Sequence, residues 1–300
     1  MTAHNTPRIS FIGFGEAGQA IAAGLREVGI AQIAAWDILF PEETGAPLRA
    51  AGEAIGARLA TSAADAVRES DIVFSAVTAA SSFKAAQSVA PHLSGTPYYL
   101  DINSVSPGRK QQSARLLGES ARYIDVAVVS AIHPARHKSP MLIAGPDAEA
   151  AGAALKSIDM NISVVGPNVG AAAAIKMIRS VMIKGIEALT LECFLAASRA
   201  GVLGEVAASL RNNYPTLEWA KLIDYNIERM ARHGLRRAAE MEEVAETLRE
   251  FGIEPLMVEA TVERQRAMGA LGKQDSVRAA IERGGAAILA AIAAAGNKTG

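Results

Sequence analysis

Two contrasting patterns along the 300 residues predict an α/β domain over residues 1–165 and an all-α domain over residues 166–300. Short apolar runs alternate with helix-like segments up to about residue 165, and a glycine-rich turn follows the first run. From Val169 onward the apolar residues recur only at helical spacing. Strands that alternate with helices indicate a mostly parallel sheet, so the first domain is expected to be doubly wound.

Composition narrows the class of protein. The 30 basic and 31 acidic residues give a formal net charge of -1, which offers no basic surface for nucleic acid or an anionic membrane. The single cysteine, Cys193, excludes a disulfide framework and a cysteine zinc site, and suits a reducing cytoplasm. The longest apolar run, residues 285–295, is shorter than the roughly 20 residues that span a bilayer. We therefore expect a cytoplasmic protein without a membrane or nucleic-acid partner, and without a metal site.

The first strand, Ile9–Ile12, leads directly into a glycine-rich turn with the sequence Gly13-Phe14-Gly15-Glu16-Ala17-Gly18. A helical segment, residues 19–28, and a second strand, residues 32–36, follow. This is the dinucleotide-binding (Rossmann) fingerprint in its strand–turn–helix context. Gly13 permits the tight turn, Gly15 lets the backbone approach the pyrophosphate, and Gly18 lets the helix pack against the strand. All six residues are predicted to contact the cofactor; the alternative is a glycine-rich turn that binds no nucleotide.

Asp37 ends the second strand, nineteen residues after Gly18. A carboxylate at this place accepts hydrogen bonds from the adenosine ribose hydroxyls and repels a 2′-phosphate, so NAD is predicted in preference to NADP. The alternative is that Asp37 is a plain turn residue at the strand end.

Ligands of open parallel sheets collect at the carboxyl ends of the strands. A buried strand over residues 71–77 ends at Val77 and Thr78, which are predicted to line the cofactor crevice. The strand 98–101 ends near Asn103 and Ser104, which are candidate cofactor and substrate contacts. In the alternative interpretation, Asn103 and Ser106 shape a turn and cap the helix that Pro107 begins.

A basic loop, residues 130–140, joins the strands 122–129 and 141–144 and contains His133, Arg136, His137 and Lys138. Ser130 and His133 are predicted to bind substrate there, because a basic loop at a strand end is suited to a carboxylate. The same loop is equally consistent with a solvated connection. The histidines lack a convergent acidic or cysteine set, which argues against a metal ion.

The stretch 166–180 begins as a glycine-rich turn and becomes a long helix that carries one lysine, Lys176, among alanine, isoleucine and methionine. A hydride-transfer enzyme needs a group that exchanges a proton with the substrate hydroxyl. Desolvation in such surroundings disfavours the ammonium form, so the pKa of Lys176 is expected to fall toward the range of a general base.

The motifs at Gly13–Gly18, Asp101–Pro107 and Gly166–Lys176 resemble the β-hydroxyacid dehydrogenases, which include 3-hydroxyisobutyrate and 6-phosphogluconate dehydrogenases. The resemblance covers essentially the whole chain. It implies a 6-phosphogluconate-dehydrogenase-like C-terminal domain, Lys176 as catalytic acid/base, nicotinamide and substrate contacts from residues 101–105, and a homodimer.

Departures from the family pattern fall around the substrate. Arg179 stands where the family often has asparagine or histidine, and Ser180 stands where it usually has asparagine. The family's Ser-Gly-Gly loop is replaced by Val129-Ser130-Ala131. Arg236-Arg237 is nearest to the family's Lys-Asp element. The sequence thus resembles a less characterised branch, with Arg179 and Ser180 predicted to orient the substrate at the catalytic centre.

We therefore predict an NAD(P)-dependent oxidoreductase that moves hydride between nicotinamide and a small, anionic hydroxy compound or its carbonyl. Two alternatives remain open: an imine reductase of the same fold, and a protein that binds NAD(H) without turnover. Imine reductases usually lack the lysine, so Lys176 argues against the first.

Overall fold

The structure is a computed structural model and describes residues 6–296. The chain divides into two compact units, Met1–Lys176 and Met177–Gly300. The predicted domain ranges, 1–165 and 166–300, include residues 1–5 and 297–300, which lie outside the described part of the chain.

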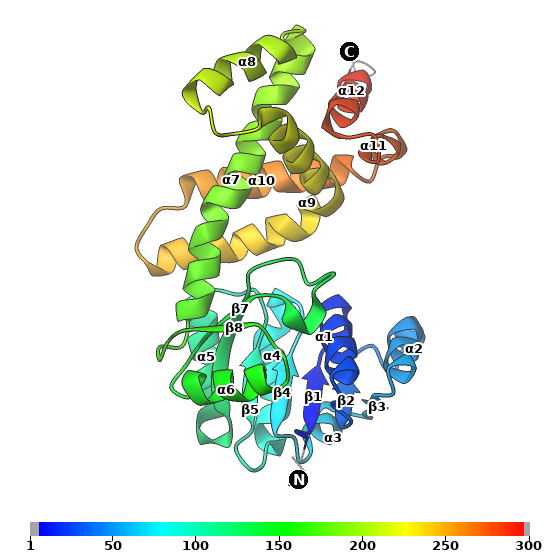
Figure 1. Cartoon of the computed structure of the whole chain (residues 1–300), viewed down its shortest axis with the longest axis vertical. Coiled ribbons are helices and arrows are strands. Elements are labelled where there is room, and N and C mark those ends of the chain that lie inside the picture. The colour runs from blue at the N-terminus through cyan, green and yellow to red at the C-terminus, as the bar shows by residue number, and fades with distance from the viewer. Residues whose placement is uncertain (1–5, 297–300) are drawn as a thin grey trace. The chain divides into compact units, whose positions relative to one another are not determined.

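The first unit is built on one sheet, which has eight strands within the described residues, in the order β3-β2-β1-β4-β5-β6-β7-β8 (Figure 1). The strands from β1 to β6 are parallel, β7 runs antiparallel to β6, and β8 is parallel to β7. Their bounds are β1 Ile9–Ile12, β2 Ile33–Trp36, β3 Arg58–Leu59, β4 Ile72–Ser75, β5 Tyr98–Asp101, β6 Arg122–Val128, β7 Met141–Ala144 and β8 Ile162–Gly166. The predicted doubly wound sheet is confirmed.

Helices cover both faces of this sheet, because successive strand residues point to opposite sides and both sides are apolar. Phe11, Phe74 and Leu100 belong to a core with α1, α2 and α6, whereas Val73 and Tyr99 belong to a core with α3, α4 and α5. The helices are α1 Glu16–Glu27, α2 Ala46–Ala54, α3 Ala63–Val67, α4 Ser82–Val89, α5 Pro107–Leu117 and α6 Ala148–Ser157.

Strand order defines the place where a ligand is expected. The chain leaves β1 for β2 and β3 on one side, then crosses to β4 and β5 on the other. Adjacent carboxyl ends of β1 and β4 therefore form the topological switch point, where ligands of open α/β sheets bind.

The second unit is helical, as predicted, and α7 (Ala171–Ala200) runs into it from the first unit. The helices α8 Leu203–Asn213, α9 Trp219–Glu250, α10 Leu256–Leu271, α11 Asp275–Ile281 and α12 Gly285–Gly296 follow. Asp275 is the first residue of α11, whose N-cap position, Gln274, makes no side-chain cap, and α12 follows it.

Close packing and a buried ion pair hold the second unit together. A Cβ on Gly234 of α9 would lie 2.3 Å from the carbonyl oxygen of Gln265 on α10, so glycine is needed for this helix approach. Arg237 on α9 donates from Nε to Glu187 on α7 at 3.0 Å, and both residues are buried. No described helix is both long enough and apolar enough to cross a bilayer.

Candidate functional site

Gly13 makes the tight turn that the fingerprint requires. Its φ of +91° lies in the left-handed region, which side chains other than glycine rarely adopt. An added Cβ would lie 2.3 Å from the carbonyl oxygen of Ala76, which follows β4. Two elements at the switch point thus approach each other directly at this glycine.

Gly15 and Gly18 differ in the space around them. A Cβ on Gly15 would meet no atom within 4 Å, so the space in front of this backbone is open. A Cβ on Gly18 would lie 2.7 Å from the carbonyl oxygen of Gly13, so Gly18 is needed for packing. Gly15 also occupies the N-cap position of α1 without a side-chain cap. The free N–H groups of this helix end therefore border an open cradle suited to an anionic pyrophosphate.

The other three fingerprint residues differ in their exposure. The Phe14 ring is fully buried in the core, and its backbone N–H donates to Oδ2 of Asp37 at 2.8 Å. Glu16 is exposed and Ala17 is half-buried at the start of α1. Oδ1 of Asp37 accepts from the N–H of Leu39 at 3.0 Å. The Asp37 carboxylate is thus oriented by the fingerprint turn and by the chain that follows β2, and it remains partly exposed.

Asn103 is buried at the edge of the sheet, and its side chain joins β4 to β5. Its Oδ1 accepts from the N–H of Val77 at 2.7 Å, and its Nδ2 donates to Ser75 at 3.0 Å and to Asp101 Oδ1 at 2.7 Å. Only 4% of Asn103 is exposed. The side chain therefore shapes the strand ends, as the alternative interpretation proposed, and its contact with a ligand stays a prediction.

Val77 and Thr78 follow β4 at this edge. Val77 is half-buried, and Thr78 is exposed and donates from Oγ1 to Ser81 at 3.1 Å. Ser106 accepts from the N–H of Arg109 at 3.4 Å, so it caps α5. The exposed Thr78 after β4 and the half-buried Ser104 after β5 are therefore accessible at the sheet edge.

Lys176 and Ser104 meet at the carboxyl end of β5. Nζ of Lys176 donates to Oγ of Ser104 at 2.5 Å, across 72 positions of sequence. Both residues are half-buried and belong to the first unit. The structure therefore brings the predicted acid/base to the same sheet edge as the fingerprint turn.

A buried charged cluster that the sequence analysis missed lies behind this pair. Asp101 and Asp125 are register partners on β5 and β6, and Lys110 of α5 reaches their oxygens at 3.2 Å and 3.5 Å. All three residues are at most 1% exposed. Burial raises the pKa of the Asp125 carboxyl, while Lys110 and the N–H of Ala173 oppose that shift. The available signal was an aspartate inside each of two apolar strands.

The basic loop is used mainly within the first unit. Arg136 pairs with Glu27 of α1 through two hydrogen bonds, and Lys138 pairs with Asp159 at 2.5 Å. His137 is 3% exposed, and burial lowers its pKa. His133 and Ser130 are exposed, and Ser130 Oγ donates to the carbonyl of Ala131 at 3.2 Å. Arg136 and Lys138 thus already have carboxylate partners in the protein. The exposed side chains of Ser130 and His133 are accessible to a ligand, and their contact with substrate stays a prediction.

Arg179 and Ser180 belong to the helical unit. They follow Lys176 by three and four residues on α7, where Arg179 is exposed and Ser180 is 8% exposed. Their roles in substrate orientation stay predictions.

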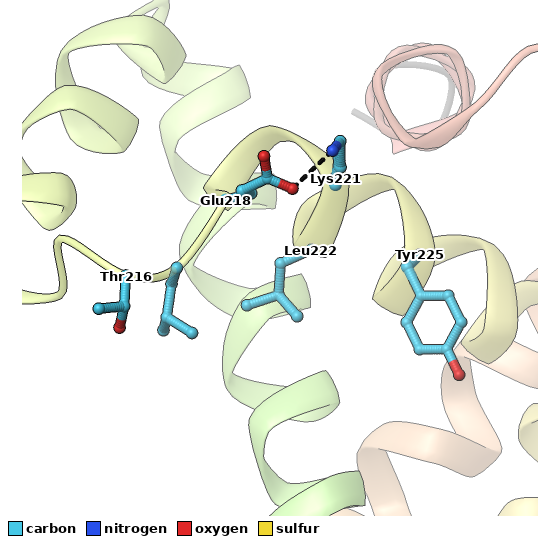
Figure 2. Close-up of a pocket in the computed structure, with 6 residues that line it drawn as sticks. Thr216, Glu218, Lys221, Leu222 and Tyr225 are labelled. Atoms are coloured by element: carbon cyan, nitrogen blue, oxygen red, sulfur yellow. Dashed lines mark ion pairs between the residues drawn. The ribbon is translucent and has the colours of Figure 1, made fainter.

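The second unit carries a shallow hollow at the start of α9 (Figure 2). Its volume is about 410 Å³, and Lys221 and Glu218 in its wall pair with each other at 2.6 Å. None of the predicted site residues lines it. Across residues 6–296, no three histidine, cysteine, aspartate or glutamate side chains form a group that could hold a metal ion.

Comparison with known proteins supports this interpretation. Residues 8–103 match the family model described as NADP oxidoreductase coenzyme F420-dependent, and residues 197–268 match a domain of unknown function, DUF1932. A conserved hypothetical protein from Sinorhizobium meliloti is 37% identical over 95% of this chain and 96% of its own, with a TM-score of 0.78. The chain belongs to the family of that conserved hypothetical protein.

More distant structures extend the comparison. Conserved protein MTH1747, of unknown function and described as structurally similar to 3-hydroxyacid dehydrogenases, is 29% identical over 88% of this chain and 97% of its own, with a TM-score of 0.71. Two structures share the fold alone. A 3-hydroxyisobutyrate dehydrogenase from Mycobacterium tuberculosis is 16% identical over 88% of this chain and 94% of its own, with a TM-score of 0.73. An imine reductase from Myxococcus stipitatus is 20% identical over 95% of this chain and 98% of its own, with a TM-score of 0.59. Together, fold and family support an oxidoreductase that depends on a nicotinamide dinucleotide.

Proposed function

We propose that this protein transfers hydride between a nicotinamide dinucleotide and a small hydroxy compound or its carbonyl, with Lys176 as the general acid/base. The observation that carries the proposal is the Lys176–Ser104 hydrogen bond of 2.5 Å at the sheet edge that also bears the fingerprint turn. A nitrogen acid/base held by a hydroxyl group is well suited to exchange a proton with a substrate hydroxyl.

The first unit fits the cofactor. The open backbone at Gly15 and the uncapped start of α1 would hold the pyrophosphate, and the partly exposed Asp37 would accept hydrogen bonds from the adenosine ribose. Val77, Thr78 and the Asn103–Ser104 backbone border the same edge. When bound, the nicotinamide ring supplies or receives the hydride. Because a carboxylate repels a 2′-phosphate, we propose NAD as the preferred cofactor.

Lys176 would then move the proton that accompanies the hydride. In oxidation its neutral amine takes the proton of the substrate hydroxyl, and in reduction its ammonium returns a proton to the developing alkoxide. Ser104 would orient the lysine side chain through the hydrogen bond to Oγ. Both directions use the same two side chains, so the geometry is consistent with a reversible dehydrogenase.

The remaining substrate contacts are assigned by position. Arg179 and Ser180 follow Lys176 by about one turn of α7 and would orient the substrate. The exposed Ser130 and His133 would contribute from the loop after β6. The cationic Arg179 favours an anionic substrate such as a hydroxy acid.

We also propose that the protein is a cytoplasmic homodimer. On α7 of the second unit, an apolar stripe recurs at helical spacing and stays exposed: Ile178 49%, Met182 64%, Ile186 39% and Leu189 57%. An exposed apolar stripe of this length indicates a protein interface, and a second copy supplies the matching face.

The decisive experiment replaces Lys176 by alanine. Loss of a general acid/base is expected to lower turnover by roughly 10²- to 10⁴-fold. The dissociation constant for NADH should stay within about twofold, because the phosphate-binding turn is untouched. The control is Lys156→Ala, which removes an exposed lysine from α6. Turnover of Lys176→Ala at the wild-type rate would overturn the role of the lysine.

An imine reductase is the second candidate, since such an enzyme shares this fold. A panel of hydroxy acids, their carbonyl counterparts and cyclic imines, each assayed with NAD(H) and NADP(H), separates the two activities. Turnover confined to the imines would favour the second candidate. Stoichiometric NADH binding without turnover on any of them would favour a protein that only binds the nucleotide.

A further inference from the structure

Asp125 supplies the cap of α7, the helix that carries Lys176. Its Oδ2 accepts from the backbone N–H of Gly170 at 3.1 Å and of Ala173 at 3.0 Å. Gly170 precedes the first residue of α7 and has no side chain with which to cap it, and Ala173 is the third residue of the helix. The carboxylate of a neighbouring strand thus takes the place of an N-cap side chain.

The backbone at this helix start is tightly seated. Gly170 has φ +99°, and a Cβ there would lie 3.1 Å from Cβ of Pro107 at the start of α5. Val169 accepts from Nε2 of Gln111 on α5 at 3.3 Å. The first turn of α7 is therefore held by β6 and by α5, and Lys176 follows Ala173 by three residues, less than one further turn.

Asp101 holds the other partner of Lys176. Its Oδ1 accepts from the backbone N–H of Asn103 at 3.0 Å and from the Asn103 side chain at 2.7 Å, directly before Ser104. Its Oδ2 accepts from the hydroxyl of Tyr123 at 2.7 Å. Burial and Asp101 raise the pKa of that tyrosine, so it stays a neutral donor.

Lys110 joins these two anchors. Its Nζ lies 3.2 Å from Asp101 Oδ1 and 3.5 Å from Asp125 Oδ1, and it donates to the carbonyl of Asp101 at 2.5 Å. One ammonium group thus serves two buried carboxylates, and the N–H groups at the start of α7 provide the second positive partner for Asp125. A cluster of this kind holds its members in one arrangement, because an unpaired buried charge is costly.

We propose that Asp125 is a positioning residue for the reaction: by capping α7, it fixes the Lys176 side chain against Ser104. Asp101 holds the loop that carries Ser104. Lys110 contacts both carboxylates and so couples the position of α7 to the position of that loop. The proposal rests on the proposed function for its kinetic consequence. Its geometric consequence, the position of the Lys176 amine, is independent of any substrate.

The test compares Asp125→Asn with wild type. Asparagine has nearly the same shape but carries one oxygen and one NH₂ group. In either orientation its NH₂ group faces a donor, Lys110 on one side or the N–H groups of Gly170 and Ala173 on the other. The matched control is Asp65→Asn, which alters a carboxylate near the N-terminus of α3 that accepts from Thr61 and pairs with Arg58.

Competitive acetylation followed by peptide mass spectrometry measures the reactivity of Lys176 against pH, with Lys156 as internal reference. For Asp125→Asn we expect the Lys176 rate to rise by roughly 2- to 30-fold, the factor that corresponds to a lost helix cap. NADH binding should stay within about twofold, and turnover should fall by roughly 10- to 100-fold, as expected for a misplaced catalytic group. Asp65→Asn should change none of these.

An unchanged Lys176 reactivity profile in folded Asp125→Asn overturns the positioning role. This outcome is distinct from failure of the proposed function, which would appear as wild-type turnover in Lys176→Ala. Should Asp125→Asn fail to fold, hydrogen exchange of the wild-type protein decides the question. The proposal requires that the backbone amides of Gly170 and Ala173 exchange among the most slowly of those in the first unit. If they exchange as fast as the amides of an exposed helix end, the proposal is overturned.

Discussion

Adding a single methyl group at Gly15 should weaken dinucleotide binding without disturbing the fold. Gly15 has φ −73° and ψ −162°, an ordinary extended conformation for alanine, and its Cβ would meet no protein atom within 4 Å. The new methyl group would instead occupy the cradle in front of α1. The substitution therefore separates a role in folding from a role in binding.

The expected magnitudes differ for the two roles. Loss of glycine at an N-cap costs at most about 1 kcal/mol of folding free energy, and the stiffer unfolded chain offsets part of this. A methyl group forced against a closely approaching pyrophosphate costs about 1–3 kcal/mol. That range corresponds to a roughly 5- to 150-fold increase in the dissociation constant.

NADH fluorescence titration measures the dissociation constant, and thermal denaturation with and without NADH measures the linked stabilisation. At 100 times the wild-type dissociation constant, NADH should stabilise wild type by about 2.7 kcal/mol, and Gly15→Ala should lose about 1–2.4 kcal/mol of this. Gly204→Ala, an exposed helix glycine with open space around it, is the control. Gly13→Ala, which would place Cβ 2.3 Å from a carbonyl oxygen, should destabilise the apoprotein itself.

Wild-type affinity in Gly15→Ala would refute the assignment of the cradle. So would a loss of apoprotein stability as large as that of Gly13→Ala, because the open space around Gly15 would then be misassigned.

Three further predictions concern other parts of the chain. Asp37→Ala should raise the dissociation constant for NADH and lower that for NADPH, since a carboxylate repels the 2′-phosphate; an unchanged ratio in parallel titrations would contradict this. Burial lowers the pKa of His137, so the unfolded chain binds a proton more readily than the folded protein does. The folded protein should therefore lose stability as the pH drops from about 7 to 5. His137→Gln should reduce this loss, measured as melting temperature against pH. Arg237→Met leaves Glu187 buried without its guanidinium partner and should cost about 3–5 kcal/mol in urea denaturation, most of which Glu187→Met in the same chain should restore.

The elements that follow from local pattern were predictable. The strand Ile9–Ile12, the turn at Gly13 and the helix after it depend on apolar spacing and on backbone conformations that glycine permits. The cap at Ser62 was equally local, because its hydroxyl accepts from the N–H of Asp65 three residues later. Such signals lie within one turn of helix or one strand.

The departures concern polar side chains whose partners are distant in sequence. Asn103 is a candidate ligand contact by its place after β5, yet its amide is used by Val77 and Ser75, which sheet order brings beside it. Arg136 is a candidate for an anionic substrate, yet Glu27 lies against it from α1. A polar residue at the end of a strand is a candidate ligand contact, but the neighbouring elements decide whether its side chain faces a ligand or binds within the protein.

By itself, the sequence determined that a dinucleotide fold precedes a helical unit, and that Lys176 lies on the helix joining them. Both follow from periodicity and from glycines whose effect is local. Tertiary structure alone decided that Lys176 meets Ser104, and that Asp125 and Asp101 anchor the two partners through Lys110. The physical reason is that a buried charge must find its counter-charge in space, and the order of strands in the sheet, rather than the order of residues in the chain, sets which groups are near enough to pair.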